Sequence, residues 1–415
     1  MLSEQAVNYP DVEPSDRSAA GTTDAARLAN RPSLAELDRE AWNRLIDVRD
    51  DPFLSQPFLA ALERHGAVSP RLGWAPRHLL LGPVDKPTGG LAAYLKAHSF
   101  GDFVYDWDWA EFAAARGQSW YPKLVVEVPY SPVSGRRLLQ RQSSAEVAER
   151  LAAGLIAETR AMDLPCVQVN HCTGDEAELL TRHGFLLRND LQLHWHNRGY
   201  TGFDDFLAEL RHKPRKNIRA ERRKLAATGV QHRWLNGHEM DENALDIAVS
   251  CYRRTFHEKG NFPALSRQFF REINRELGPR VLYCQALRDG TPVATAIFLR
   301  SRKRLYGRYW GSLDDIPGLH FETCFYQGIE YCIANDLDAF EPGAGGDHKA
   351  ARGFLPQPIY NCTWVANREL RRQLRRWLQA ERPLRADQYA HCRAASPFHD
   401  AVTDALIPHD FSSRH

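Results

Sequence analysis

The sequence predicts an α/β (α+β) protein that contains two similar mixed units in tandem. A chain of 415 residues with 43% hydrophobic content predicts about two or three domains. Short apolar runs bounded by glycine or proline, which are typical of strands, alternate with segments of helical periodicity. The order of elements before residue 200 starts again at Phe203. In each unit we expect a mixed, mostly antiparallel sheet flanked by helices.

Four segments follow from this pattern. Residues 1–33 are rich in Ser, Thr, Asp, Pro and Ala and have little apolar periodicity, so we expect a disordered tail. The first unit is predicted at 34–200 and the second at 201–366. A helix and a tail fill 367–415. The apolar stripe of that helix, which we expect to pack within the molecule, comprises Leu370, Leu374, Trp377 and Leu378.

Three apolar runs in the first unit predict strands, at 78–81, 91–96 and 123–129. The third run leads into a basic loop that contains glycine, and then into a helix over 144–162. Backbone N–H groups at a helix N-terminus, together with arginines, suit phosphate oxygens. An ordinary surface turn before a helix has a similar composition, so that alternative stays open. The candidate phosphate-binding residues in this loop are Ser134, Gly135, Arg136 and Arg137.

Similar signals recur in the second unit. The predicted helices lie at 203–210, 215–227, 244–257 and 266–277, and the predicted strands at 281–287, 292–299 and 305–310. The pair Asp289–Gly290 predicts a hairpin between the first two of these strands. A helix at 321–337 carries an apolar stripe, and strands at 339–341 and 360–365 follow it. We therefore expect a second sheet.

A basic segment opens the second unit. Between Arg211 and Lys224, eight of the fourteen residues are Lys or Arg, and Glu221 is the only acidic residue. Like charges this close repel one another on a helix, so an anionic partner removes that cost and adds attraction. Phosphate groups suit such side chains, whereas the lack of aromatic residues argues against base stacking. The candidate phosphate-binding residues are Lys213, Arg215, Lys216 and Arg219. A solvated helix face is the alternative.

The segment Glu341–Phe354, EPGAGGDHKAARGF, places flexible glycines, a histidine and a lysine directly after a predicted buried strand. Such a loop allows the backbone to approach a ligand closely. Its candidate catalytic residues are Lys349, Glu341 and Asp347. In an acyl transfer, Lys349 can stabilise an oxyanion, and Glu341 or Asp347 can accept a proton from an amine or bind its ammonium form. The alternative is a surface pair between Lys349 and Asp347, with Glu341 capping a turn.

The stretch from Asp106 to Trp109 alternates acidic residues with tryptophans. Such side chains can line a pocket for a cationic acceptor, although a half-buried strand end predicts the same alternation. The candidate acceptor-binding residues are Asp106, Trp107, Trp109, His348 and Tyr309.

Four segments taken together resemble the FemABX-like tandem-GNAT acyltransferases, and more closely the GNAT-type proteins labelled as peptidoglycan biosynthesis or recognition proteins. They are FGDFVYDWDW, YPKLVVEVPYSPVSGRRLL, RHKPRKNIRAERRK and FYQGIEYCIANDLDAFEPGAGGDHKAARGF. The string ELLTRHGF, with the strand, basic loop, helix and strand before it, looks like the second half of a GNAT domain. The resemblance covers residues 34–390.

The resemblance also implies roles for residues. In GNAT domains the loop after the fourth strand holds the pyrophosphate of the acyl donor, and residues 134–137 occupy that place here with less glycine than is usual. In the Fem group a glycine-containing loop leads to an aromatic–lysine pair, and that lysine is proposed to stabilise the charge that develops during acyl transfer. His348 and Lys349, followed by Phe354, match this arrangement, with histidine in place of the aromatic residue.

We therefore predict an acyltransferase that forms an amide bond by direct attack of an amine on an activated donor. Aminoacyl-tRNA is slightly favoured as the donor and acyl-coenzyme A is the close alternative; each is a co-substrate, and no tightly bound cofactor is expected. The expected partners are an amine-bearing small molecule or peptide and, for an aminoacyl donor, tRNA. A non-catalytic protein that recognises cell-wall precursors or RNA between its two units is the alternative from another class.

The remaining features concern location and metal binding. The 54 Lys and Arg residues nearly balance the 52 Asp and Glu residues, so the overall charge does not indicate a class of binding partner. The N-terminus is acidic and lacks an apolar core, so we expect neither a signal peptide nor a membrane span. The eight cysteines lack the spacing of a zinc site, so we expect no metal site and reduced thiols in a cytoplasmic protein.

Overall fold

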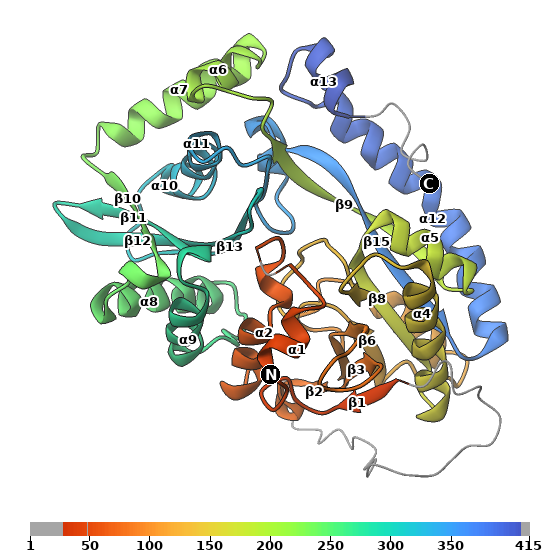
Figure 1. Cartoon of the computed structure of the whole chain (residues 1–415). Helices are drawn as coiled ribbons and strands as arrows, with labels where there is room; N and C mark the ends of the chain where they lie inside the picture. The colour runs from red at the N-terminus through yellow and green to blue at the C-terminus, as the bar shows by residue number, and fades with distance from the viewer. Residues whose placement is uncertain (1–27, 48, 408–415) are drawn as a thin grey trace.

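The strands of both halves join in one continuous sheet of eleven strands in the computed structural model, which describes residues 28–47 and 49–407 (Figure 1). In spatial order the strands are β10 (Gln231–Asn236), β11 (Val281–Arg288), β12 (Thr291–Arg300), β13 (Arg304–Ser312), β14 (Ala339–Glu341), β9 (Leu186–His196), β15 (Leu355–Val365), β8 (Cys166–Cys172), β6 (Lys123–Val126), β5 (Ala93–Lys96) and β2 (Trp74–Pro76). The second sheet expected from the sequence, β10–β14, is thus joined to the sheet of the first half through β9.

Two long strands make this connection. From the second half, β15 pairs antiparallel with β9 along nine residue pairs, from Leu355↔His194 to Thr363↔Leu186. The other edge of β15 pairs with β8. From the first half, β9 continues past β15 to pair with β14. The chain thus crosses between the halves twice, and the predicted domain boundaries near 200 and 366 stay predictions.

A second, small sheet has the order β1 (Ala29–Arg31), β3 (His78–Leu81), β4 (Gly89–Leu91) and β7 (Leu139–Gln140). Because β1 pairs antiparallel with β3, residues 29–31 are ordered and do not belong to a disordered tail. Most of the predicted tail, residues 1–27, lies outside the described residues. The predicted hairpin at Asp289–Gly290 is confirmed: both residues have positive φ, 51° and 77°, as a type I′ turn between β11 and β12 requires.

The helices are α1 (Arg39–Asn43), α2 (Gln56–Arg64), α3 (Trp107–Ala114), α4 (Ala145–Ala161), α5 (Gly174–Arg182), α6 (Phe203–Ala208), α7 (His212–Ala226), α8 (Glu242–Glu258), α9 (Arg267–Leu277), α10 (Leu319–Phe321), α11 (Gln327–Ala334), α12 (Arg368–Ala394) and α13 (Asp400–Leu406). In the second half, α10 and α11 cover one face of the β10–β13 strands and α8 and α9 cover the other, while α7 lies outside α11 (Figure 1). None of the helices in residues 28–407 combines the length and the apolar character that a membrane crossing needs.

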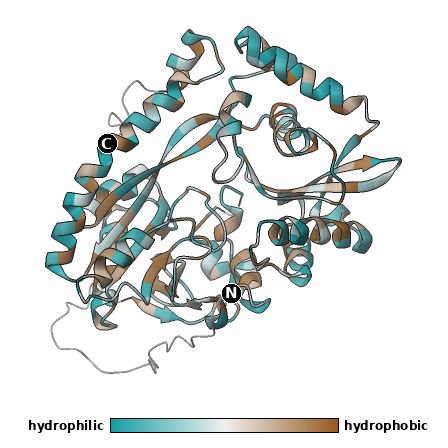
Figure 2. Ribbon diagram, turned by 180° about the vertical axis from the view of Figure 1, so that it is seen from behind, coloured by the Kyte–Doolittle hydropathy of each residue, from teal (hydrophilic) through white to brown (hydrophobic). Residues whose placement is uncertain are grey.

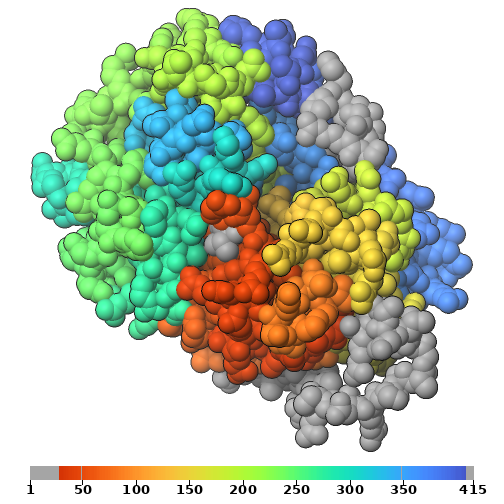
Figure 3. Space-filling view, in the orientation of Figure 1, coloured from red at the N-terminus to blue at the C-terminus, as the bar shows by residue number. Residues whose placement is uncertain are grey.

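The N-terminal helices lie between the halves. In the space-filling view the N-terminal region, in red, separates the green surface of the second half from the yellow surface of the first (Figure 3). One core cluster contains Phe58 of α2, Phe269 of α9 and Tyr94 of β5. The rings of Phe58 and Phe269 meet edge to face at 5.7 Å. Apolar burial therefore also holds the two halves together.

Helix α12 packs within the molecule, as its apolar stripe predicts. Leu370, Leu374 and Leu378 are buried and join a cluster with Trp109 and Leu186. The opposite face of the helix is hydrophilic (Figure 2). The amphipathic pattern alone was thus sufficient to identify the buried side of this helix.

The packing of α12 gives a matched test of stability. Leu374 is fully buried, whereas Leu384 on the same helix is 67% exposed. We expect Leu374→Ala to lower the free energy of unfolding by about 2–5 kcal/mol, because it removes buried methyl groups and leaves a cavity. Leu384→Ala should change it by no more than about 0.5 kcal/mol. Chemical denaturation of both variants checks this, and equal effects would contradict the packing described.

Candidate functional site

The glycine-containing loop leaves the sheet at the end of β14 and returns at the start of β15. Gly343, Gly345 and Gly346 have φ values of 87°, 68° and 90°, a region that L side chains rarely adopt. A Cβ atom at Gly346 would also lie 2.8 Å from the ring of His348. The short helix Asp347–Arg352 follows. The glycines thus allow a sharp turn that brings His348 and Lys349 back over the sheet.

Lys349 is held inside this turn. Its side chain is 4% exposed, and its Nζ atom donates to the carbonyls of Gly343 at 2.7 Å and Ala344 at 3.3 Å. Burial lowers the pKa of the ammonium group to about 8, with a further contribution from the positive charge of Arg308. The side chain of Asp347, predicted to be catalytic or to pair with Lys349, lies outside the described part of the structure. A lysine that is easily deprotonated therefore occupies the centre of the loop.

The helix facing Lys349 is irregular. Between α10 and α11, the residues Glu322–Tyr326 form a π-helical turn, a feature often found at functional sites. This turn carries Cys324 and lies against the loop of Lys349 through Phe325, whose ring is 5.6 Å from that of His348. Burial raises the pKa of the Cys324 thiol well above its usual range, so the thiol stays protonated.

Aromatic and imidazole side chains pack around the same π-helical turn. His348 lies 5.5 Å from Phe321, 5.6 Å from Phe325 and 5.9 Å from His320, measured between ring centroids. His320 in turn packs at 5.3 Å from Trp310. His348 is exposed and His320 and Phe321 are half-buried, so this ring cluster reaches the surface beside Lys349. We define the ring cluster as His320, Phe321, Phe325, His348 and Trp310.

Arg352 connects the loop to the basic helix α7. Its guanidinium group lies 3.5 Å above the ring of Phe321 and donates to the carbonyl of His348 at 2.8 Å. It also forms an ion pair with Glu221 of α7 at 2.8 Å. Glu221 accepts a further hydrogen bond from Tyr326. The single acidic residue of the basic segment is therefore the attachment point between α7 and the loop.

The two faces of α7 differ in role. Ile218, Glu221, Arg222 and Leu225 form an inner stripe with helical spacing. Within it, Arg222 makes ion pairs with Glu322 and Glu330, both at 2.9 Å. The exposed basic residues on the outer face are Lys213, Lys216, Arg219, Arg223 and Lys224, while Arg215 is half-buried. Of the predicted phosphate-binding residues, Arg219 forms an ion pair with the exposed Asp204 at 3.0 Å. Figure 2 shows α7, at the upper right, as largely hydrophilic.

Glu341 does not lie in the ring cluster. It is 3% exposed, and its Oε1 atom accepts from Arg304 at 2.8 Å. Burial raises the pKa of the carboxyl group, and the Arg304 guanidinium opposes that rise. The other oxygen, Oε2, is buried without a hydrogen-bond partner among the described residues. Arg304 is thus the partner of Glu341, and the predicted catalytic role of Glu341 stays a prediction.

The first-half loop also differs from its predicted role. Arg137 is 1% exposed, and its Nε and Nη2 atoms donate to the carbonyls of Asn170 and Val133 at 2.8 Å and 2.5 Å. Its guanidinium group therefore binds backbone and is not available to a phosphate. The N–H of Gly135 donates to the carbonyl of His171 at 3.0 Å, and the Ser134 hydroxyl is buried without a partner among the described residues. Only Arg136 of this set is exposed.

The residues around Asp106 form an internal network instead of a pocket lining. Asp106 is 1% exposed and accepts from Trp120 Nε1 at 2.7 Å, Lys123 Nζ at 2.7 Å and Gln168 Nε2 at 2.8 Å. Trp109 is also buried. The alternation was misleading because Trp107–Ala114 is a helix, α3, so Trp107 and Trp109 point in different directions. Trp107, which is 41% exposed, is the only one of the three available to a ligand.

Tyr309 and Trp310 are neighbours on β13 and so point to opposite faces of the sheet. Tyr309 packs against Tyr252 of α8 at 5.0 Å, away from the ring cluster. Trp310 packs on His320. The predicted acceptor residue Tyr309 thus lies on the face of the sheet opposite to the ring cluster, and its acceptor role stays a prediction. The sequence offered no signal for which residue faces the cluster, because both are aromatic neighbours on one strand.

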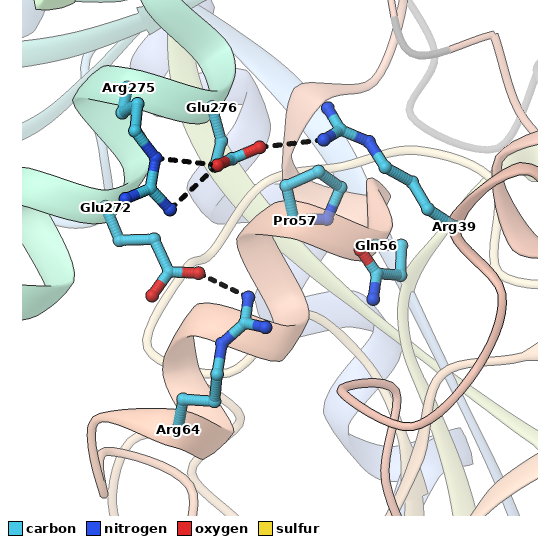
Figure 4. Close-up of a pocket in the computed structure, with 7 residues that line it drawn as sticks. All are labelled: Arg39, Gln56, Pro57, Arg64, Glu272, Arg275 and Glu276. Carbon is cyan, nitrogen blue, oxygen red and sulfur yellow. Dashed lines mark hydrogen bonds and ion pairs between the residues drawn. The ribbon is translucent and has the colours of Figure 1, made fainter.

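A charged pocket of about 320 Å³ lies elsewhere, where α1 and α2 meet α9 (Figure 4). Its charges already pair with one another: Arg39 and Arg275 bind Glu276 at 2.7 Å and 2.9 Å, and Arg64 binds Glu272. None of the predicted site residues lines it. Among residues 28–407 with described side chains, no three His, Cys, Asp or Glu residues are grouped so that they can hold a metal ion.

Comparison with known proteins adds a family and a fold. A family model named FemAB-like, described as peptidoglycan biosynthesis/recognition, matches residues 33–400. No functionally curated protein matches the chain. The C-terminal domain of a putative lysylphosphatidylglycerol synthetase from Agrobacterium fabrum aligns with a TM-score of 0.52 and 11% identity over 82% of this chain and 96% of its own. FemX aligns with a TM-score of 0.51 and 10% identity, over 82% of this chain and 99% of FemX.

A tandem GNAT protein from the clavulanic acid biosynthesis pathway also aligns, with a TM-score of 0.41 and 14% identity over 82% of this chain and 99% of its own. The fold is that of two GNAT-like units in tandem, as the sequence predicted, and the alignment with FemX supports this assignment.

The state of Lys349 can be tested without any substrate. In an NMR titration of protein labelled with ¹³C-lysine, two side-chain signals should titrate well below the ordinary lysine value near 10.4, that of Lys349 near pH 8 and that of Lys96, whose pKa burial lowers to about 7. Lys349→Arg should remove the signal near pH 8 and leave the others in place. If the signal that is lost in Lys349→Arg titrates above pH 10 in the wild-type protein, the buried environment described here is contradicted.

Proposed function

Because the chain belongs to the FemAB-like family and has a tandem-GNAT fold, we propose that it is an acyl- or aminoacyltransferase that forms an amide bond on an amine acceptor. The observation that carries this proposal is the environment of Lys349. A buried ammonium group, bound to two loop carbonyls, lies beside a cluster of rings that reaches the surface. This combination offers a positive charge of fixed position next to a surface on which a substrate can lie.

Lys349 is proposed to stabilise the oxyanion of the tetrahedral intermediate. When the amine attacks an ester or thioester carbonyl, negative charge develops on the carbonyl oxygen. A preorganised cation in a site of low dielectric constant stabilises that charge without reorganisation. The carbonyls of Gly343 and Ala344 hold the ammonium group in place. The loop glycines that permit this turn therefore serve the chemistry indirectly.

We propose direct attack without an acyl-enzyme intermediate. The π-helical turn that lies against the loop of Lys349 carries Cys324, and burial raises the pKa of its thiol well above its usual range. A protonated thiol is a poor nucleophile. Proximity of donor and amine in one site supplies much of the rate enhancement in such a reaction.

Aminoacyl-tRNA is the slightly favoured donor, and acyl-coenzyme A is the alternative. The exposed basic face of α7 suits a large polyanion, and Glu221 and Arg352 attach this helix to the loop of Lys349. In the first half, the loop in which a GNAT domain holds a pyrophosphate offers only Arg136 as an exposed cation. The acceptor is proposed to be an amine-bearing small molecule or peptide, and the protein is proposed to be cytoplasmic.

A direct assay tests the enzyme proposal. Purified protein is incubated with alanyl-tRNA, glycyl-tRNA or acetyl-coenzyme A, each with lysine, a lysine-containing pentapeptide or glucosamine. Amide formation by the wild-type protein, with kcat/KM lower by about 10²–10³-fold in Lys349→Met, is expected when one oxyanion-stabilising group is lost. Consumption of no donor would favour the alternative, a non-catalytic protein that binds cell-wall precursors or RNA.

The pH dependence of turnover follows from the pKa of Lys349. The ammonium form of Lys349 predominates below about pH 8 and is lost as the pH rises through that value, so kcat/KM should fall as the pH rises above about 8. Lys349→Arg keeps a positive charge at all these pH values, so its residual kcat/KM should not decrease above about pH 8. The same decrease in the arginine variant would show that another titrating group causes it.

The donor proposal predicts a salt effect. Replacement of Lys213, Lys216 and Arg219 by Gln should weaken tRNA binding and reduce its salt dependence, because fewer counterions are released. A matched control replaces three other exposed arginines, Arg71, Arg141 and Arg382, by Gln. Binding of tRNA and of acetyl-coenzyme A is measured against salt concentration. If the binding of acetyl-coenzyme A depends steeply on salt concentration and that of tRNA does not, acyl-coenzyme A becomes the preferred donor.

A further inference from the structure

The route of the proton is not settled by Lys349, which is a cation. Amide formation releases one proton from the attacking nitrogen, and a base must accept it. Glu341 is buried and bound to Arg304, and the thiol of Cys324 is protonated. His348 is exposed at the edge of the loop. One further titratable side chain of the ring cluster remains, on a different element from Lys349.

We propose that His320 is the group that accepts the proton of the attacking amine, a role that rests on the transferase function proposed above. His320 lies directly after Leu319, at the start of the irregular helix that carries the π-helical turn. Its ring is packed between Trp310 at 5.3 Å and Phe325 at 5.3 Å, with His348 at 5.9 Å. These contacts fix the imidazole beside the loop of Lys349 and leave it half-exposed.

The surroundings of His320 favour its neutral form. Burial lowers the pKa of the imidazole to about 4, and the charged groups that face it add to this effect. They are the cationic side chains of Lys349 and Arg352 from the glycine loop and of Lys259 from the end of α8, together with His348. An imidazole that is neutral at physiological pH has a free lone pair and can accept a proton. A carboxylate beside it would have the opposite effect, and none is among the described groups that face the imidazole.

The reaction balances with this one base. The amine nitrogen attacks the carbonyl carbon of the ester or thioester, a C–N bond forms, and the nitrogen becomes positively charged. His320 takes the proton from that nitrogen. The C–O or C–S bond then breaks, and the leaving alcohol or thiol receives the proton from the imidazolium. Ester or thioester plus amine gives amide plus alcohol or thiol, and the enzyme returns to its starting state.

A cationic environment also explains why the His320 imidazolium releases its proton to the leaving group. The imidazolium formed during the reaction lies near Lys349, Arg352 and Lys259, so its proton is readily given to the leaving group. A base that held the proton tightly would accumulate in its protonated form. His320 is thus suited to transfer the proton twice in each turnover.

The test uses the full chain with alanyl-tRNA or acetyl-coenzyme A and the lysine-containing pentapeptide. We expect His320→Gln to lower kcat by about 10²–10⁴-fold, with KM for the donor changed by less than about threefold. The rate of His320→Ala should recover in part on addition of free imidazole, an effect that a purely structural role would not produce. His238→Gln, at an exposed histidine of the same half, is the matched control and should keep wild-type kcat.

Each outcome decides the question. If the wild-type protein turns over and His320→Gln keeps its kcat, the role of His320 is refuted and the transferase function stands. If the variants fold with wild-type circular dichroism but imidazole restores nothing, the role is also refuted. If the wild-type protein consumes neither donor, the proposed function fails and the inference fails with it.

Discussion

The exchange of strands between the halves is the constraint on which the site depends. The glycine-containing loop begins at β14, which pairs with β9 of the first half, and it ends at β15, which pairs with both β9 and β8. Both ends of the loop are therefore fixed by backbone hydrogen bonds to the other half. Lys349 keeps its position because the sheet is continuous, and its geometry cannot be assigned to the second unit alone.

The site also depends on how the protein compensates for buried charge. An ammonium group without water is costly unless it is hydrogen-bonded, and among the described side chains and backbone groups Lys349 is bound by carbonyl dipoles. These dipoles solvate its charge without neutralising it. Arg352 is treated differently, with a full ion pair to Glu221 and a ring beneath it. One cation thus remains available to a developing negative charge, while the other holds the loop against α7.

Much of this arrangement could be predicted from the sequence, and the failures have physical causes. The strand Ala339–Glu341 and the loop after it were located correctly because glycine and apolar patterns are local signals. Asp106 and Arg137 were misassigned because their burial depends on partners distant in the chain, such as Gln168 and Asn170. His320 was missed because its neighbours, Trp310 and His348, come from a strand and a loop on either side of it in sequence. Composition identifies the chemical groups, but only the fold shows which of them are already hydrogen-bonded or ion-paired within the protein.

Glu221 lies on the inner stripe of α7, and the contacts of this stripe fix the rotation of the helix about its own axis. Ile218 and Leu225 are buried there, and Arg222 pairs with Glu322 and Glu330. The Glu221 carboxylate adds its bonds to Arg352 and Tyr326. The outer lysines and arginines therefore present their charge to one side of the molecule. A positive surface thus takes its orientation from the contacts on the opposite face of its helix.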